Sequence, residues 1–137
     1  MFIWDPSVAN FSSFMIGAGL MIEGYFLGYS HSLRIVNIYG PYNQKQDFWD
    51  RVKASGILNY HKIIMGEDLN FTLSAEEIWG TGRFSDPLRD NFRAYLENEG
   101  LNDIILVVLT PTWSNGRLGQ VGIAKCLDRF FYERFIV

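Results

Sequence analysis

The segment Lys62–Phe71 has the sequence Lys-Ile-Ile-Met-Gly-Glu-Asp-Leu-Asn-Phe, an apolar run that ends in a carboxylic acid and an amide two residues apart. Its apolar half predicts a buried strand. Because side chains at positions i and i+2 of a strand leave the same face, we expect Asp68 and Asn70 to project together beyond the end of a sheet. The alternative is an Asp-Leu-Asn turn, since Asp and Asn commonly end strands by bonding to nearby backbone groups.

The size and composition of the chain indicate one small domain. It has 137 residues, of which 48% are hydrophobic, enough for one modest core. An aromatic share of 16% with 13 glycines favours short strands packed in a sandwich over a helical bundle. The net charge of −3 gives no general attraction for nucleic acid, so phosphate binding would need a local cluster or a divalent metal.

Cysteine use and hydropathy exclude several protein classes. Cys126 is the only cysteine, which rules out an internal disulfide, and no Cys/His spacing indicates zinc. The most apolar N-terminal stretch, Phe14–Tyr29, is interrupted by Glu23 and by glycines, so it does not predict a membrane-spanning helix. No basic segment precedes it, which argues against a signal peptide. We expect an intracellular protein without a membrane partner.

Strands are expected in both halves of the chain. Residues 1–13 have no clear period and are treated as a lead-in to one domain over residues 14–137. An interrupted strand is expected over Met15–Leu27, with its glycines at bulges or close backbone approaches. A β-branched strand over Leu33–Tyr39 follows, and Ala124–Val137 predicts a last strand.

The first helix is expected between two of these strands. Asn43 and Gln46 resemble a capping box that opens a helix carrying Trp49 on its apolar side. The strand Lys62–Met65 follows this helix. The strand, helix, strand order indicates that both strands lie in one sheet with the helix packed on its face.

The second helix has the clearer end signals. Asp86 is the expected N-cap, Pro87 takes the first helical position and Gly100 ends the helix. Before it, residues 72–83 are expected to form an irregular surface segment, and after it Leu101–Leu109 predicts one or two short strands.

Four separated pieces of the chain follow one another in a characteristic order: Ile38–Pro41, Gly66–Asn70, Thr112–Arg117 and Leu127–Phe130. Together they resemble the endonuclease/exonuclease/phosphatase superfamily, and most of all the endonuclease of plant non-LTR retrotransposons. The pattern of that endonuclease passes through a Tyr-Gly-Pro turn, a Gly-Asp-Phe-Asn strand end, a Thr-Trp-Ser-Asn turn and a Leu-Asp-Arg strand. The resemblance spans residues 17–135, and its specificity comes from four matches in order.

The resemblance implies an α+β fold, an incomplete four-layer αββα sandwich, and a Mg²⁺-dependent phosphodiester hydrolase that acts on DNA. By this resemblance Asp68 handles the attacking water or the leaving oxygen, and Asn70 binds the scissile phosphate. Tyr39 brings a hydroxyl to the same phosphate, Thr112 supports it, and Asp128 orients a histidine acid/base. A carboxylate beside a divalent cation can activate water, and neutral donors stabilise charge on phosphoryl oxygens.

The same resemblance implies that Trp113, Asn115 and Arg117 contact the substrate. Simpler interpretations stay open for several residues. Trp113 fits a core position, Arg117 fits a solvated hairpin tip as well as a contact to a nucleic-acid backbone, and Asp128 beside Arg129 fits an ordinary ion pair.

Parts of the family pattern have no counterpart in this chain. Its early Asn and metal-binding Glu motifs are not recognisable before Tyr39, and its final Ser-Asp-His does not occur before Val137. Glu23, His31 and His61 lie in other contexts, so the metal ligands stay unassigned and both histidines are expected at the surface.

We therefore expect the middle and later part of a nuclease domain, inactive or nearly inactive alone, because catalytic groups act as a unit. The alternatives are a non-catalytic remnant or interaction domain, and a phosphatase of the same superfamily. The resemblance also suggests a reverse transcriptase domain in a longer parent protein and a nuclear location.

Overall fold

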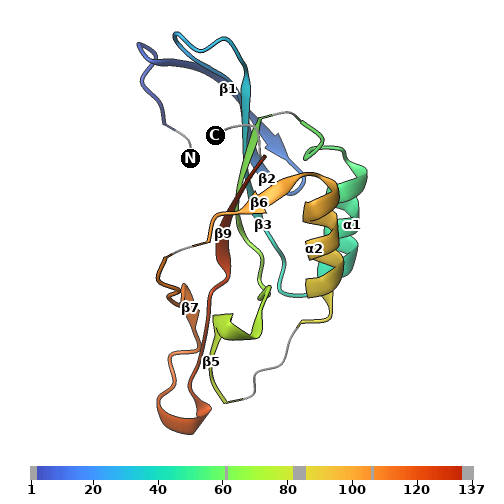
Figure 1. The fold of residues 1–137 in the computed structure, drawn as a ribbon, viewed down its shortest axis with the longest axis vertical. Coiled ribbons are helices and arrows are strands. Elements are labelled where there is room, and N and C mark those ends of the chain that lie inside the picture. Colours follow the sequence, from blue (N-terminus) through green and yellow to red (C-terminus); the bar gives the residue numbers. More distant parts are fainter. Residues whose placement is uncertain (1–2, 61, 82–85, 106, 134–137) are drawn as a thin grey trace.

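The computed structural model describes residues 3–60, 62–81, 86–105 and 107–133. This part of the chain forms two sheets and two α-helices (Figure 1). The larger sheet has six strands in the order β1-β2-β3-β4-β9-β6, and the smaller has three in the order β5-β8-β7. Strands β3 and β4 run parallel, and the other neighbours are antiparallel.

The bounds of the elements follow the chain. The large sheet contains β1 (Ala9–Ile16), β2 (Gly19–Phe26), β3 (Leu33–Tyr39), β4 (Ile63–Asp68), β6 (Leu101–Asp103) and β9 (Asp128–Glu133). The small sheet contains β5 (Ile78–Gly80), β7 (Trp113–Ser114) and β8 (Ile123–Lys125). The helices are α1 (Lys45–Ala54) and α2 (Leu88–Asn98), with short 3₁₀ turns at Ala75–Glu77 and Gly119–Val121.

The first two strands form a hairpin in which β1 pairs with β2 along its whole length. The limit between the lead-in and the domain, after residue 13, falls inside β1. The strand expected over Met15–Leu27 is instead the end of β1, a turn, and β2. Close backbone approaches are confirmed: a Cβ at Gly24 would lie 1.9 Å from the carbonyl oxygen of Asn10.

The predicted strand, helix, strand unit is confirmed by β3, α1 and β4. The two strands pair in parallel, and α1 buries Trp49 and Val52 in the core that covers them. The capping box is wrong. Residue Gln44 takes the N-cap position in a left-handed conformation and makes no side-chain cap, while the Gln46 amide donates to Asp50 Oδ1 at 2.9 Å.

The glycine at the end of the second helix is confirmed, whereas the predicted start is wrong by one residue. Pro87 takes the N-cap position and Leu88 the first helical position, and the main-chain N–H of Leu88 donates to Asp86 Oδ1 at 3.0 Å. Gly100 has φ of 68°, and its N–H donates to the carbonyl of Glu97 at 3.1 Å. This left-handed position favours glycine.

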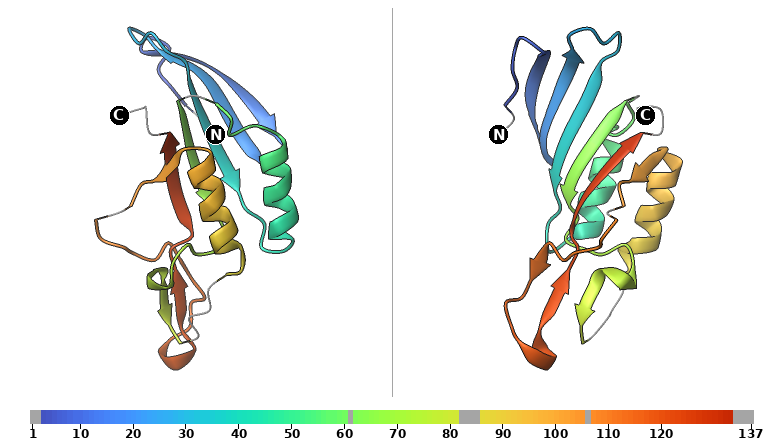
Figure 2. Two further views of the ribbon diagram at one scale, coloured as in Figure 1. Left: turned by 45° about the vertical axis from the view of Figure 1, so that its right-hand side comes forward. Right: turned by 60° about the vertical axis from the view of Figure 1, so that its left-hand side comes forward.

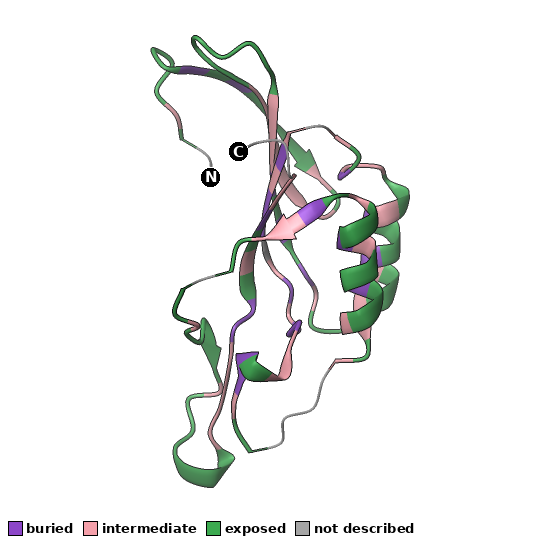
Figure 3. Cartoon of the chain, viewed as in Figure 1, coloured by how far each residue is buried: buried purple, intermediate pink, exposed green. Residues whose placement is uncertain are grey.

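Both helices cover the same face of the large sheet, and the main core lies between the helices and this face (Figure 2). Aromatic rings fill its centre: the Phe92 ring centroid lies 4.7 Å from that of Trp49, 5.3 Å from Phe71 and 6.2 Å from Phe131. Buried residues concentrate in this layer, while the outer sides of the helices are exposed (Figure 3).

The opposite face of the large sheet, called here the open face, carries no helix among the described residues. Its β1–β2–β3 end holds a small cluster in which Trp4 packs against Phe11 and its neighbours. Towards β9 the apolar cover is thin, and Phe130 is 58% exposed.

The C-terminal part differs from expectation in two places. Only Leu101–Asp103 of the stretch Leu101–Leu109 forms a strand in the described residues. The last strand is broken into β8 and β9 at Cys126 and Leu127, and residues 134–137 lie outside the described residues. Neither described helix has the length and apolar character needed to cross a bilayer.

Candidate functional site

Three polar side chains stand in one line at the end of three adjacent strands. Tyr39 ends β3 and pairs in register with Asp68, which ends β4; Asp68 in turn pairs with Asp128, which begins β9. Register partners in a sheet point to the same side. Tyr39, Asp68 and Asp128, called here the strand-end row, therefore share the open face, and with Asn37 and Phe130 they border a cavity of about 240 Å³.

Asn70 reaches the row by a turn and not along a strand. Strand β4 ends at Asp68, and Asn70 has φ of 56°. Its main-chain N–H donates to Asp68 Oδ1 at 2.9 Å, and its side-chain amide donates to the Gly40 carbonyl. The expectation that Asp68 and Asn70 leave one face of a strand is wrong, and the Asp-Leu-Asn turn is confirmed. The turn nevertheless keeps Asn70 between the ends of β3 and β4.

Gly40 allows the ends of β3 and β4 to approach closely. Its N–H donates to the Asp68 carbonyl at 2.8 Å. A Cβ at this position would lie 2.7 Å from the carbonyl oxygen of Leu69 and 2.9 Å from that of Asp68. Any larger residue would push the two backbones apart and separate Tyr39 from Asp68.

Thr112 holds the main chain next to the row by hydrogen bonds to backbone groups. Its hydroxyl oxygen accepts the N–H of Leu127 at 2.9 Å and that of Asp128 at 3.1 Å, and its own N–H donates to the Lys125 carbonyl. The hydroxyl thus holds the chain at the start of β9. Through these hydrogen bonds Thr112 fixes the backbone of Asp128.

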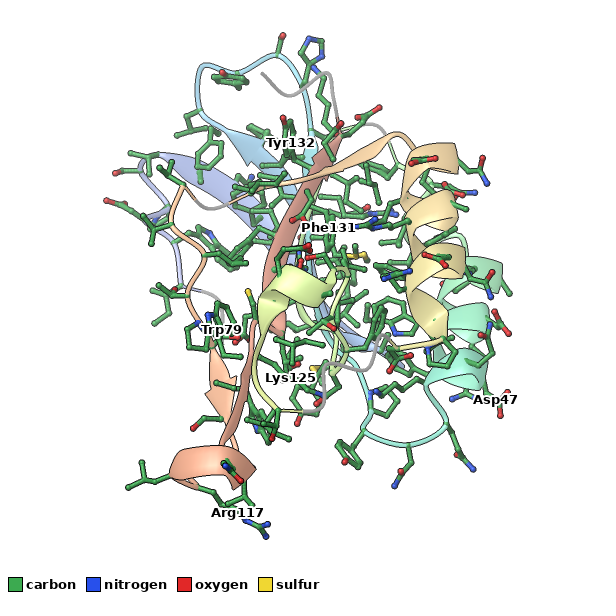
Figure 4. The ribbon with its side chains drawn as sticks, turned by 60° about the horizontal axis from the view of Figure 1, so that its bottom comes forward. Asp47, Trp79, Arg117, Lys125, Phe131 and Tyr132 are labelled. Carbon is green, nitrogen blue, oxygen red and sulfur yellow. The ribbon has the colours of Figure 1, made fainter. Side chains whose placement is uncertain are left out.

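The other predicted substrate contacts lie on the small sheet, which extends away from the large one (Figure 1). Trp113, on β7, is 45% exposed and so is not a core residue. Asn115 closes the following loop. Its side-chain Oδ1 accepts the main-chain N–H groups of Arg117 and Ile123, each at 3.1 Å, and its side-chain Nδ2 donates to the Val121 carbonyl. Arg117 points outward from the loop tip (Figure 4).

A buried charged group that was not predicted from the sequence lies on the helix-covered side of the sheet next to the row, and it is formed by Glu77, Asp103 and Arg129. Arg129 pairs with both acids and not with Asp128. Desolvation by burial raises the pKa of Asp103, although the Arg129 charge opposes the shift. Burial also works against the charged guanidinium, but hydrogen bonding to Glu77 and the charge of Asp103 raise the pKa of Arg129. Alternation along β9, with apolar Phe131 two residues on, could have indicated that Arg129 points inward.

The side chains considered for a metal site are separated. Glu23 is paired with Arg34, whose Nε donates to Glu23 Oε1 at 2.7 Å. Arg34 lies five residues before Tyr39 on β3, which corresponds to about 16 Å along the strand. His31 is exposed, and His61 lies outside the described residues. Across the described part of the chain, no group of three or more His, Cys, Asp or Glu side chains could hold a metal ion.

Asp68 and Asp128 offer a smaller donor set. Side chains directly opposite each other in an antiparallel pair have Cβ atoms about 4.5–5.5 Å apart, and like charges there are unfavourable. Neither carboxylate takes part in an ion pair with another described residue. Mg²⁺ commonly binds through one or two carboxylates together with waters and phosphate oxygens. The pair therefore fits such an ion when phosphate is present.

Comparisons with known proteins support the fold. No protein-family model matches the chain, and no curated protein sequence matches it. A solved structure does match: the endonuclease domain of TRAS1, a telomere-specific non-LTR retrotransposon, with a TM-score of 0.72 and 15% identity. The match covers 96% of this chain and 58% of that chain. The expectation of an α+β fold that forms an incomplete sandwich of the endonuclease/exonuclease/phosphatase type is confirmed.

Proposed function

We propose that the chain is part of a metal-dependent phosphodiester hydrolase domain, a DNA endonuclease of the retrotransposon type. The observation that carries this proposal is the strand-end row: Tyr39, Asp68 and Asp128 lie in register across three strands, with Asn70 turned in beside them. The endonuclease fold of the structural neighbour supports it. The proposed similarity to plant elements rests on the sequence motifs alone.

Each member of the row suits one part of phosphodiester hydrolysis. Asp68 accepts a proton from water or assists the leaving oxygen, and Tyr39 and Asn70 donate hydrogen bonds to the phosphate. Asp128 stands opposite Asp68 and would orient an acid/base group. Mg²⁺ would be held by Asp68 and Asp128, and when bound it would neutralise charge on the phosphoryl oxygens.

The small sheet is the proposed contact surface for DNA beyond the scissile phosphate. Trp113 offers an exposed ring, and Arg117 is carried outward on a loop that Asn115 closes by three hydrogen bonds. A loop arginine contacts a phosphate backbone without reading sequence. Asn115 then acts through the loop, and Arg117 makes the contact.

We further propose that this polypeptide alone cleaves DNA weakly or not at all. Glu23 is engaged with Arg34, and the row contains two carboxylates and no histidine among the described residues. Groups that act as a unit lose most of the rate when one is missing. A non-catalytic remnant is favoured by the same observation. A phosphatase of this superfamily, a linked reverse transcriptase domain and a nuclear location rest on the resemblance alone.

The first experiment measures nicking of supercoiled plasmid in Mg²⁺ by wild type, Asp68→Ala and Asp47→Ala. Asp47 is an exposed carboxylate on α1 (Figure 4), and α1 covers the face of the sheet opposite to the row, so its variant is the matched control. We expect no nicking, or a trace that all three proteins share. Robust metal-dependent nicking abolished only by Asp68→Ala would overturn the proposed inactivity and establish the hydrolase.

The second experiment separates a DNA-binding domain from a remnant without a DNA partner. Binding to a fluorescein-labelled duplex is followed by anisotropy over a range of salt concentrations. We expect Arg117→Gln to weaken binding and to lower the magnitude of the slope of log K against log salt concentration by about one, as for the loss of one phosphate contact. Arg51→Gln, on the exposed side of α1, should leave both unchanged. Absence of wild-type binding would contradict the DNA assignment.

A further inference from the structure

The two sheets meet at a two-residue break between β8 and β9. Cys126 and Leu127 link β8 of the small sheet to β9 of the large one, and Asp128 follows at once. The N–H of Cys126 donates to the carbonyl of Glu77 at 3.1 Å, and the N–H of Leu127 donates to Thr112. The position of Asp128 is thus set where the two sheets join.

A buried charge network lies directly behind this joint. Arg129 and Glu77 have side chains only 8% exposed, and Asp103 is 22% exposed. Arg129 Nη1 donates to Asp103 Oδ2, and Nη2 lies against Glu77 Oε1. The other oxygen of Glu77 accepts the N–H of Leu73 at 2.7 Å. One guanidinium therefore connects β9, β6 and the 3₁₀ turn before β5.

A contribution to folding stability alone does not explain why this charge network is buried. Buried ion pairs lose much of their attraction to desolvation, and apolar replacements of equal volume are often as stable. In addition, Asp103 Oδ1 and Arg129 Nε are buried without a hydrogen-bond partner among the described residues. The planar, two-pronged guanidinium instead favours a fixed geometry between the two acids it contacts.

We infer that Arg129 is a positioning residue that holds Asp128 in the strand-end row. Thr112 fixes the backbone N–H groups of Leu127 and Asp128 from one side, and Arg129 anchors the next residue from the other. The Asp128 carboxylate is exposed and has no ion pair with another described residue, so its place is set through the backbone, by the pairing with Asp68 of β4 and by these two anchors. What Asp128 then does rests on the proposed function.

The test uses a neutral network of similar volume, the triple variant Glu77→Gln, Asp103→Asn, Arg129→Met. The matched control is the double variant Glu23→Gln, Arg34→Met, which removes another partly buried ion pair of the same sheet. Arg129→Lys keeps the charge but presents one nitrogen where the guanidinium presents two. Circular dichroism and urea unfolding first establish that each variant folds.

The readout is amide hydrogen exchange by NMR, residue by residue. Local opening lowers the protection of a few amides, whereas a loss of global stability lowers the most protected core amides together. We expect the triple variant to lower the protection of Leu127 and Asp128 roughly tenfold more than that of Met65 and Phe131. Arg129→Lys should give an intermediate loss, and the control should give none.

The inference is overturned if protection at Leu127 and Asp128 is unchanged, or if it falls only in parallel with Met65 and Phe131. If the triple variant fails to fold, Arg129→Lys still provides the comparison with the control. The same proteins are then tested for binding to the labelled duplex. Wild type that binds no DNA would contradict the proposed function, while the exchange result would still decide the positioning of Asp128.

Discussion

The two faces of the six-stranded sheet are made by the same strands and differ in almost every property. On the helix-covered face Val36, Met65 and Phe131 have no measurable exposure. On the open face Tyr39 and Phe130, which belong to the strands of Val36 and Phe131, are 68% and 58% exposed. Alternation along a strand places successive residues on opposite sides, so one strand supplies both environments.

Stability and the candidate chemistry are therefore separated across the thickness of one sheet. The helix face contains the interlocked aromatic rings of Trp49, Phe71 and Phe92. The open face contains the strand-end row and a thin apolar cover. Changes on the helix face should therefore alter unfolding. Changes on the β4–β9 part of the open face, outside the buried cluster around Phe11, should alter function with little effect on the fold.

The largest expected difference comes from two adjacent phenylalanines of β9. Phe131→Ala removes a fully buried ring that contacts Phe92 and should cost about 3–5 kcal/mol of unfolding free energy. Phe130→Ala removes a ring from the open face and should cost less than about 1 kcal/mol. Urea unfolding of both variants measures the difference, with Phe131→Leu as a milder substitute if the alanine variant does not fold. Equal losses would contradict the separation.

A smaller loss of stability is expected from a substitution on the open face. A Cβ at Gly66 would lie 2.8 Å and 3.1 Å from two atoms of the Phe130 ring. We expect Gly66→Ala to lower the unfolding free energy by about 1 kcal/mol, because the ring must move off the strand. In a Phe130→Ala background the same change should be nearly neutral, since all three nearest atoms belong to that ring. Additive losses in urea would show that the backbone, and not the ring, limits the space.

Several elements of the helix-covered layer could be predicted from local sequence. Strands β3 and β4 have β-branched or apolar runs, and α2 has Asp86, Pro87 and Gly100 at its ends. These signals act over a few residues, so they survive without knowledge of the fold. The failed capping box in α1 shows their limit, because Gln44 in a left-handed conformation starts that helix.

Strand β1 was not predicted because its apolar pattern is weak. It lies at the edge of the sheet and contains Asn10, Ser12 and Ser13 beside its buried residues. An edge strand is stabilised by pairing with its neighbour, here β2, and that pairing is not visible in the strand's own sequence.

The resemblance implies that the candidate residues act on one phosphate, but the arrangement that brings them together could not be predicted from the sequence. Motifs identified Tyr39, Asp68 and Asp128, yet their common row depends on the register of β9 against β4, a pairing between residues 60 positions apart. Asn70 was expected on a strand and lies in a turn. Arg129 was considered only as a partner of Asp128, because its partners Glu77 and Asp103 come from other parts of the chain. Long-range contacts decide the register and the partners of Arg129, while Asn70 is held by the local turn with Asp68 and by its hydrogen bond to Gly40.

The smallest expected effect tests whether the row is electrostatically strained. Asp68 and Asp128 are direct cross-strand partners of like charge, so Asp128→Asn should raise the unfolding free energy by about 0.5 kcal/mol at neutral pH and low salt. The gain should shrink in 1 M NaCl, because salt screens exposed charges. Asp68→Asn should give less, because Asp68 Oδ1 accepts the Asn70 N–H and a neutral amide oxygen accepts it more weakly than a carboxylate does, which weakens the turn. Urea unfolding at both salt concentrations measures the effect. A loss of stability in Asp128→Asn would mean that this carboxylate makes a stabilising contact that outweighs its repulsion from Asp68.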